Sequence, residues 1–158
     1  MEQEIFLREY QPEDVQALAS IYYHTIHKIN SEHYTQEQVN AWAPLKSLET
    51  TGWREKFLKT HPIIATTREK IVGFVEFEKS GHIDCFYCHH EWVKKGVGSL
   101  LMKEILKRAK ANDIPIIFAE VSITARPFFI KWGFTTILEQ KKVINGVQLT
   151  NFKMERLI

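Results

Sequence analysis

Residues 115–121, with the sequence PIIFAEV, form a short and almost continuously apolar run. A strand of this kind is typical of a sheet whose two faces are both covered by other elements. The segments on either side of it have helical spacing. Before it, residues 97–111 repeat apolar side chains every three or four positions. After it, a helix begins at Thr124 or Arg126 and ends at Gly133, a residue favoured at helix C-termini. The pattern predicts a buried strand between two helices.

The rest of the chain alternates between the same two kinds of segment. Three N-terminal helices are predicted, and their signals are Gln11-Pro12-Glu13-Asp14 at the first start, the capping box Thr35-Gln36-Glu37-Gln38 at the second, and helical spacing over residues 52–58. Predicted strands cover residues 5–8, 63–67, 70–78 and 82–89, and a final hairpin joins 135–144 to 147–156 through Asn145-Gly146. The order βααα–βββ–α–β–α–ββ indicates an α/β fold with one mixed sheet.

Length and composition are those of an ordinary globular protein. The 158 residues suit one domain spanning residues 1–158, with 44% hydrophobic and 25% charged residues. A net charge of +2 without a basic face argues against nucleic acid or an anionic membrane as partner. The acidic start Met1-Glu2-Gln3-Glu4 is unlike a signal peptide, and no apolar run approaches the roughly 18 residues of a membrane span. We therefore expect a cytoplasmic protein.

The strongest local signal is Val93-Lys94-Lys95-Gly96-Val97-Gly98-Ser99, which follows a predicted strand and opens a helix. Glycines take turn angles that other residues resist and let a ligand approach the backbone. Free N–H groups at a helix start, beside the positive end of the helix dipole, bind phosphate groups. The segment is not a P-loop, because no Gly-Lys-Ser/Thr follows, and it lacks the third glycine of a dinucleotide fingerprint. It predicts a site for phosphate or pyrophosphate.

Two segments together resemble one family. The first, Val93 to Gly98, is similar to the pyrophosphate loop of GNAT acyltransferases, Gln/Arg-x-x-Gly-x-Gly/Ala. The second, ARPFFIKWGF at residues 125–134, resembles the family's Ala-x-x-Phe-Tyr-x-x-x-Gly-Phe helix end. The resemblance covers roughly residues 5–156. Residues 21–44 are similar to a bacterial subgroup, the YafP-type acetyltransferases.

The resemblance implies a mixed, mostly antiparallel sheet flanked by helices, in which strands 82–89 and 115–121 form a splayed parallel pair. It implies acetyl-CoA as cosubstrate, with pantetheine between these strands and pyrophosphate on the N–H groups of residues 93–99. The implied cofactor-binding residues are Phe86, Tyr87, Cys88, Val93, Lys94, Lys95, Gly96, Val97, Gly98, Ser99, Ser122 and Phe129.

Two positions depart from the family's pattern. Val93 replaces the usual Gln or Arg, which is a small loss because most phosphate contacts come from backbone donors. Phe129 replaces the Tyr that protonates the departing thiolate in many members, and phenylalanine has no proton to donate. A free thiol has a pKa of about 8.5, so its anion is a fair leaving group without an acid. Tyr87, Ser122 or water are alternative donors.

Acetyl transfer to an amine needs a base, because an alkylammonium with a pKa of about 10.4 is not nucleophilic until it loses a proton. His82 and Asp84 are two apart on a predicted strand and so share one face. The resemblance supports both, because in some members a base lies near the start of this strand. Glu120 on the partner strand is a third candidate and Glu76 a weaker fourth. The alternative role of each is a solvated or salt-bridged strand residue.

Residues 85–89, CFYCH, match the pattern of c-type haem attachment, and His90 extends it toward a metal site. On a strand, positions 85 and 88 project to opposite faces, so their thiols cannot share one haem or ion. We therefore expect no haem and no metal, and in the cytosol we expect reduced cysteines.

Aromatic residues gather in the N-terminal third, where the resemblance implies a roof over the acceptor site. The predicted substrate-binding residues are Trp42, Tyr23 and His27, whereas Tyr22 is expected in the core. Such a pocket suits a small, partly apolar amine or an aromatic substrate.

The predicted function is an N-acetyltransferase in which a small amine attacks acetyl-CoA directly within a ternary complex. The alternative is a CoA-binding sensor without turnover, which the phenylalanine at position 129 supports. The sequence leaves the identity of the acceptor open, and also the choice between a monomer and a homodimer.

Overall fold

A computed structural model describes residues 3–158. Its strands are β1 (Phe6–Glu9), β2 (Ile63–Thr66), β3 (Ile71–Phe77), β4 (His82–Cys88), β5 (Ile116–Ser122), β6 (Thr135–Ile144) and β7 (Val147–Leu157). Its helices are α1 (Val15–Lys28), α2 (Gln36–Trp42), α3 (Thr51–Thr60), α4 (Val97–Ala111) and α5 (Arg126–Lys131). Short 3₁₀ turns lie at Pro12–Asp14, Asn30–Glu32, Leu45–Leu48 and His90–Trp92. The predicted order of elements is confirmed.

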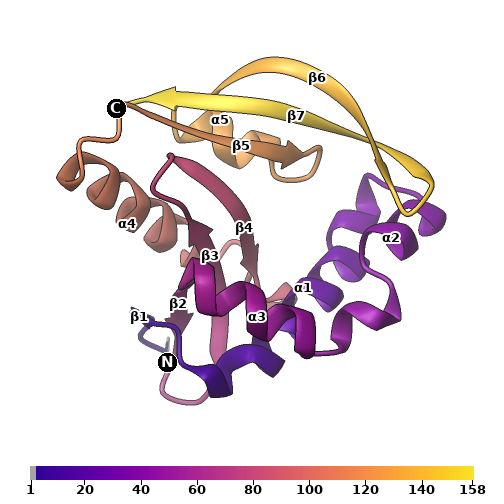
Figure 1. Ribbon diagram of the computed structural model, residues 1–158, viewed down its shortest axis with the longest axis horizontal. Helices are drawn as coiled ribbons and strands as arrows, with labels where there is room; N and C mark the ends of the chain where they lie inside the picture. The colour runs from indigo at the N-terminus through magenta and orange to yellow at the C-terminus, as the bar shows by residue number, and fades with distance from the viewer. Residues whose placement is uncertain (1–2) are drawn as a thin grey trace.

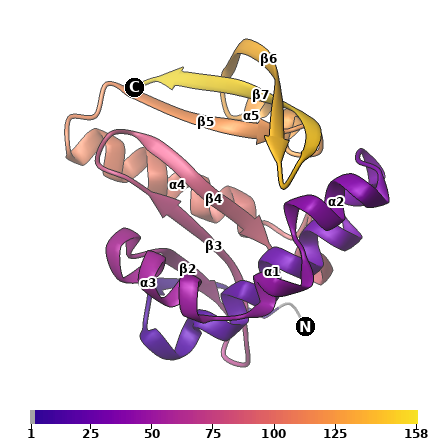
Figure 2. The same cartoon turned by 45° about the vertical axis from the view of Figure 1, so that its right-hand side comes forward.

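The strands form one mixed sheet in the order β1-β2-β3-β4-β5-β7-β6. The pair β4–β5 is parallel, and every other neighbouring pair is antiparallel. This confirms the predicted fold class. Figures 1 and 2 show β5, β6 and β7 grouped with α5, apart from the group formed by β1 to β4. None of the helices in residues 3–158 combines the length and apolar character needed to cross a bilayer.

Local signals in the sequence set the ends of several elements. The capping box at α2 is present: Thr35 Oγ1 accepts from Gln38 N at 3.1 Å, and Gln38 Oε1 accepts from Thr35 N at 2.9 Å. Asn145 and Gly146 both have positive φ, 47° and 78°, as a type I′ hairpin turn requires. The last helix ends at Lys131, two residues earlier than predicted, because Gly133 takes a left-handed φ of 86° just beyond it.

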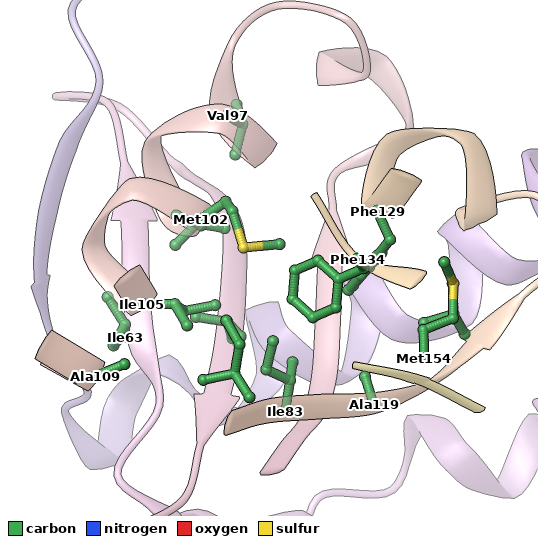
Figure 3. Packing of buried hydrophobic residues seen from close by; sticks show 14 of the residues in the cluster. Ile63, Ile83, Val97, Met102, Ile105, Ala109, Ala119, Phe129, Phe134 and Met154 are labelled. Carbon is green, nitrogen blue, oxygen red and sulfur yellow. The ribbon is translucent and has the colours of Figure 1, made fainter. Parts of the chain in front are cut away.

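Two apolar clusters cover the two faces of the sheet. Helix α4 packs on one face, where Met102 and Ile105 are fully buried beside Ile63 and Ile83 of the sheet (Figure 3). Helices α1 and α3 pack on the other face, where the buried residues are Val15, Leu18, Ile21, Phe57, Ile64, Phe74 and Cys85. Both faces of the sheet are therefore covered by apolar packing.

Strand β4 carries a one-residue bulge near its middle. Its register with β3 changes from Phe77↔Ile83 to Val75↔Phe86, so Asp84 and Cys85 together lie opposite Glu76. A bulge bends a strand and re-aims its side chains. This one places Cys85 toward α1 and α3, while Ile83 and Phe86 pack toward α4.

Candidate active site

A row of free backbone N–H groups lies at the start of α4. Among residues 3–158, none of the N–H groups of Val93–Ser99, hereafter the amide loop, donates to a protein acceptor. The N–H groups on either side are bonded: Trp92 N donates to His89 O at 2.8 Å, and Leu100 N donates to Gly96 O at 3.0 Å. The free N–H groups and the helix dipole together create an anion site.

Backbone angles and close packing shape the amide loop. Lys94 and Gly96 adopt left-handed φ values of 60° and 90°, and no atom lies within 4 Å of where a Cβ on Gly96 would be. A Cβ on Gly98 would lie 3.1 Å from a ring carbon of Phe128, so only glycine fits there without displacing that ring. Val97 is 1% exposed in the α4 cluster and anchors the loop to the sheet.

Basic side chains stand beside the amide loop. Lys95 Nζ lies 5.2 Å from the centroid of the Trp92 ring, and Lys70 Nζ lies 5.9 Å from the same centroid. These cation–π contacts hold two positive charges close to the free N–H groups. The site therefore combines main-chain donors with flexible cations.

The parallel strands β4 and β5 pair at one end only. Their register contains His82↔Phe118 and Ile83↔Ala119, and no pairing continues beyond Ile83. Farther along, His89 N donates to Val72 O at 2.8 Å, on the β3 side. Because successive N–H groups of a strand point to opposite edges, Cys88 N points to the edge that β5 has left. Cys88 O at that edge accepts from Thr25 Oγ1 at 2.8 Å. The predicted splay is thus present.

A cavity of about 290 Å³ opens on the α1–α3 side of this gap. Its charged lining residues are Lys56, His82, Asp84, Glu120 and Lys142. Its aromatic lining residues are Tyr22, Tyr34, Trp42, Trp53 and Tyr87, and the rest are Ile83, Cys85, Ser122, Ile144, Leu149, Thr150 and Asn151. The structure therefore brings together all three predicted bases, His82, Asp84 and Glu120.

The three candidate bases have different neighbours. His82 Nδ1 lies 3.3 Å from Glu78 Oε2. Asp84 Oδ2 is ion-paired with Lys56 Nζ at 2.9 Å, and Glu120 is ion-paired with Lys142. Both carboxylates thus already hold an ammonium group.

A buried ion-pair network forms the cavity floor. Glu76 is 0% exposed; its carboxylate pairs with Lys56 Nζ at 3.0 Å and accepts from Thr60 Oγ1 at 2.5 Å. Burial acts to lower the pKa of Lys56, but the nearby carboxylates of Glu76 and Asp84 outweigh it and raise that pKa. Burial is also the main cause that raises the pKa of the Cys85 thiol far above its ordinary value. Lys56 therefore stays charged and Cys85 stays a thiol, so neither is a nucleophile at neutral pH.

Two predicted substrate-binding residues lie elsewhere. Trp42 lines the cavity, but Tyr23 and His27 do not. His27 Nε2 is bonded to Ala43 O at 2.7 Å, and the Tyr23 ring stacks on His27 with centroids 4.2 Å apart. Tyr22 lines the cavity as well as packing against the apolar cluster that contains Ile26 and Val39, so its expected core role is only part of what it does. One residue step turns a helix by about 100°, and this step decides which tyrosine faces the sheet.

Predictions near α5 had mixed outcomes. Phe129 is 4% exposed and packs among Phe86, Phe128 and Phe134, so its side chain belongs to the core and does not face the cavity. Its role as a cofactor contact stays a prediction. Ser122 does line the cavity, and its hydroxyl oxygen accepts from Asn30 Nδ2 at 3.3 Å and from Ala125 N at 3.0 Å.

The haem-like cysteine pair is divided between the two faces of the sheet. Cys85 packs in the α1–α3 cluster and Cys88 packs against the α4 cluster, as predicted. Beyond them, the ligand atoms of His89, His90 and Glu91 lie within 4.8 Å of one another. An ammonium group already occupies this spot, because Lys28 Nζ lies 3.3 Å from His90 Nε2.

Several cavity residues escaped sequence reasoning. Lys56, Lys142 and Asn151 come from α3, β6 and β7, far apart in the chain, and nothing local marks them. Glu78 had a usable signal: it lies four residues before His82 across a tight strand turn, where Glu78 N donates to His82 O at 2.9 Å.

Comparison with known proteins agrees with this geometry. Residues 30–156 match the family described as Acetyltransferase (GNAT) domain. The chain is 33% identical over 150 residues to the uncharacterized N-acetyltransferase YafP of Escherichia coli, covering 95% of this chain and 94% of that protein. A GCN5-related N-acetyltransferase from Rhodopseudomonas palustris is 30% identical with a TM-score of 0.92, covering 100% and 99% of the two chains.

A more distant structure shares the fold alone. The PaiA N-acetyltransferase of Thermoplasma acidophilum, solved with coenzyme A, is 19% identical with a TM-score of 0.73 over 98% of this chain and 99% of that chain. The matching family model and the two N-acetyltransferases of 33% and 30% identity identify the protein as an acyltransferase. It belongs to the GNAT family and is an N-acetyltransferase, for which acetyl-CoA is the acetyl donor.

Proposed function

We propose that acetyl-CoA binds with its pyrophosphate on the amide loop, and that a small amine in the cavity attacks the thioester directly. The free N–H groups of Val93–Ser99 carry this proposal, because they need an anion to satisfy them. Tyr87 of β4 and Ser122 of β5 both line the cavity, and β4 leads on toward the amide loop, so we place pantetheine along the edges of these two strands. Holding both reactants together supplies much of the rate.

The thioester oxygen is polarised by the backbone of β4. Cys88 N points to the open edge of the strand, where it can donate to the oxygen that gains charge in the transition state. Thr25 supports this geometry by fixing the carbonyl of Cys88 through a bond of 2.8 Å. A backbone donor of this kind costs little to reorganise during the reaction.

His82 acts as the general base in this mechanism. A proton on its Nδ1 is held by Glu78, which leaves the lone pair of Nε2 to accept a proton from the amine. Asp84 and Glu120 are less suited, because each carboxylate already binds a lysine. Glu78 is a positioning residue that fixes the tautomer and the ring.

Ser122 is the proton donor for the departing thiolate. Its oxygen accepts from Asn30 and Ala125, so its own hydrogen is free to point elsewhere. Tyr87 also lines the cavity, and burial is the main cause that raises its pKa well above the ordinary value, so its phenol stays protonated. Because a thiolate leaves without much assistance, we expect either substitution, Ser122→Ala or Tyr87→Phe, to slow transfer only modestly.

A matched pair of glycine variants tests the cofactor site. Gly96 and Gly146 both have left-handed φ, 90° and 78°, and neither has an atom within 4 Å of a built Cβ. Alanine at either position therefore costs a similar strain of about 1–2 kcal/mol. We expect Gly96→Ala to weaken coenzyme A binding roughly tenfold in calorimetry, by distorting the loop, and Gly146→Ala to leave binding unchanged.

Two results would contradict the proposal. Equal affinities for coenzyme A in both glycine variants would show that the amide loop does not hold the cofactor. Tight binding without thiol release over a broad panel of amines would instead favour the CoA sensor, whose support is the missing hydroxyl at Phe129.

A further inference from the structure

The size and walls of the cavity restrict the acceptor. Its volume of about 290 Å³ lies at the lower end of ordinary small-molecule pockets, which measure about 300–1,000 Å³. Aromatic side chains line it from α1, α2, α3 and β4. Tyr22 is central, with edge-to-face contacts to Trp53 at 4.8 Å and to Tyr87 at 5.1 Å between centroids. These rings are held in place before any ligand arrives.

The polar atoms of several of these aromatic side chains donate hydrogen bonds to backbone carbonyl groups of the protein. Tyr22 Oη donates to Trp42 O at 3.2 Å, Tyr34 Oη donates to Thr150 O at 2.7 Å, and Trp53 Nε1 donates to Ser47 O at 2.7 Å. Tyr22, Tyr34 and Trp53 therefore present ring surfaces to the cavity, with their polar atoms turned to the protein. Ring surfaces favour a flat apolar body and a positive charge near it.

The charges of the cavity favour a cation over an anion. Lys56 is ion-paired with two carboxylates, those of Glu76 and Asp84, and Lys142 is ion-paired with Glu120. Counting Glu76, which is 0% exposed behind the lining, two ammonium groups pair with three carboxylates, so this ion-pair network has one negative charge in excess. A carboxylate on the acceptor would have to displace one of these pairs, whereas an ammonium group adds to them.

An unused acceptor atom lies in the same wall. Asn151 comes from β7 beside Ser122, and its Oδ1 is buried without a hydrogen-bond partner among the described residues. A buried acceptor left unpaired costs free energy, which a ligand N–H can recover. Asn151 itself lines the cavity, so a rotation of its side-chain amide would present this oxygen to the donor hydrogens of an amine.

We propose that the acceptor is a compact arylalkylamine without a carboxylate: a primary ammonium group bonded to Asn151, with its ring among Tyr22, Trp42 and Trp53. This inference rests on the proposed function, since it names the amine that attacks acetyl-CoA. The ammonium loses its proton before its nitrogen bonds to the acetyl carbon, and the C–S bond then breaks to release coenzyme A as a thiol.

A panel of amines tests the acceptor class on the full chain. Coenzyme A release is measured with 2-phenylethylamine, phenylalanine and putrescine. Compared with 2-phenylethylamine, phenylalanine adds a carboxylate and putrescine lacks the ring. We expect kcat/KM for 2-phenylethylamine to exceed that of the other two by at least tenfold. Equal or better use of phenylalanine or putrescine overturns the inference.

Asn151→Leu tests the anchoring atom. We expect it to raise KM for 2-phenylethylamine roughly tenfold, with little change in kcat and none in the affinity for coenzyme A. Asn40→Leu is the matched control, because Asn40 is exposed on α2 and its Oδ1 bonds Gln36 outside the cavity. An unchanged KM in Asn151→Leu would contradict the role of Asn151.

A wrong acceptor class and a wrong proposed function give different experimental results. If acetyl-CoA binds and other amines are acetylated in place of 2-phenylethylamine, the acceptor class is wrong and the transfer mechanism stands. If acetyl-CoA does not bind in calorimetry, the proposed function is wrong and the acceptor class falls with it.

Discussion

The two sides of the β4–β5 gap offer different kinds of groups for binding a ligand. The amide loop, on the α4 side, uses main-chain N–H groups from consecutive residues, backed by an apolar cluster. The cavity, on the α1–α3 side, is lined by side chains from separate elements. One of its charged groups, Lys56, is ion-paired with the buried carboxylate of Glu76. A main-chain site tolerates altered side chains, such as Val93 in place of Gln or Arg. The cavity depends on individual groups, so single substitutions should have large effects there.

The largest effect is expected at the cavity floor. Lys56→Met leaves the carboxylate of Glu76, which is 0% exposed, without its cation. Removal of one partner of a buried pair costs about 3–5 kcal/mol in the free energy of unfolding. Urea denaturation measures this loss, and Lys59→Met, an exposed lysine on the same helix, should lose little.

The pH dependence of this loss has a definite sign. The pKa of Lys56 is raised in the folded state, so its contribution is fully present below the ordinary value of 10.5 and disappears as the pH rises through the higher folded value. The double variant Lys56→Met with Glu76→Gln should regain part of the stability. If Lys56→Met unfolds no more easily than Lys59→Met, the network does not stabilise the cavity side.

The next largest effect is expected at His82, the proposed general base. We expect His82→Ala to lower kcat/KM for acetyl transfer about 10²–10³-fold, within the usual range for general base catalysis, and to leave the affinity for coenzyme A unchanged. His33→Ala is a suitable control, because His33 is exposed and bonds Thr124.

Glu78→Gln separates catalysis from positioning. We expect a loss of about tenfold in kcat without a change in KM, because the amide holds the ring less firmly than a carboxylate does. A larger loss in Asp84→Asn than in His82→Ala would move the role of base to Asp84.

Much of the fold was predictable because its signals are local. Helix α4 begins at Val97 and ends at Ala111 as predicted, since a glycine-containing turn precedes it and its apolar spacing is regular. The capping box at Thr35 and the turn at Asn145-Gly146 lie within a few residues of sequence. The amide loop belongs to this group, so the turn with free N–H groups before α4 could be expected from the sequence.

The cavity was predicted less well because it forms across the chain. Lys56 and Glu76 come from α3 and β3, and their pairing follows from tertiary packing. Tyr23 and His27 were chosen from α1, but only the packed helix shows that Tyr22 faces the gap. The bulge that re-aims Asp84 and Cys85 has no sequence signal of its own. Side-chain sites of this kind need the folded structure.

A smaller effect is expected at the boundary between the two sides. Phe129→Tyr places a hydroxyl in the aromatic cluster of Phe86, Phe128 and Phe134 without a partner, which costs about 1–3 kcal/mol. Thermal unfolding measures this cost, and Phe6→Tyr, at a residue 38% exposed, should be nearly neutral. A rise in kcat without loss of stability would instead show that the new hydroxyl reaches the thiolate.

The smallest effects test the main-chain character of the amide loop. Lys94→Ala and Lys95→Ala should each weaken coenzyme A binding less than about fivefold, because exposed charges contribute below about 1 kcal/mol and are screened by salt. Calorimetry at low and high salt should show this difference shrinking as ionic strength rises, while the loss caused by Gly96→Ala persists. A tenfold or greater loss from either lysine, retained at high salt, would mean that side chains govern binding on both sides of the gap.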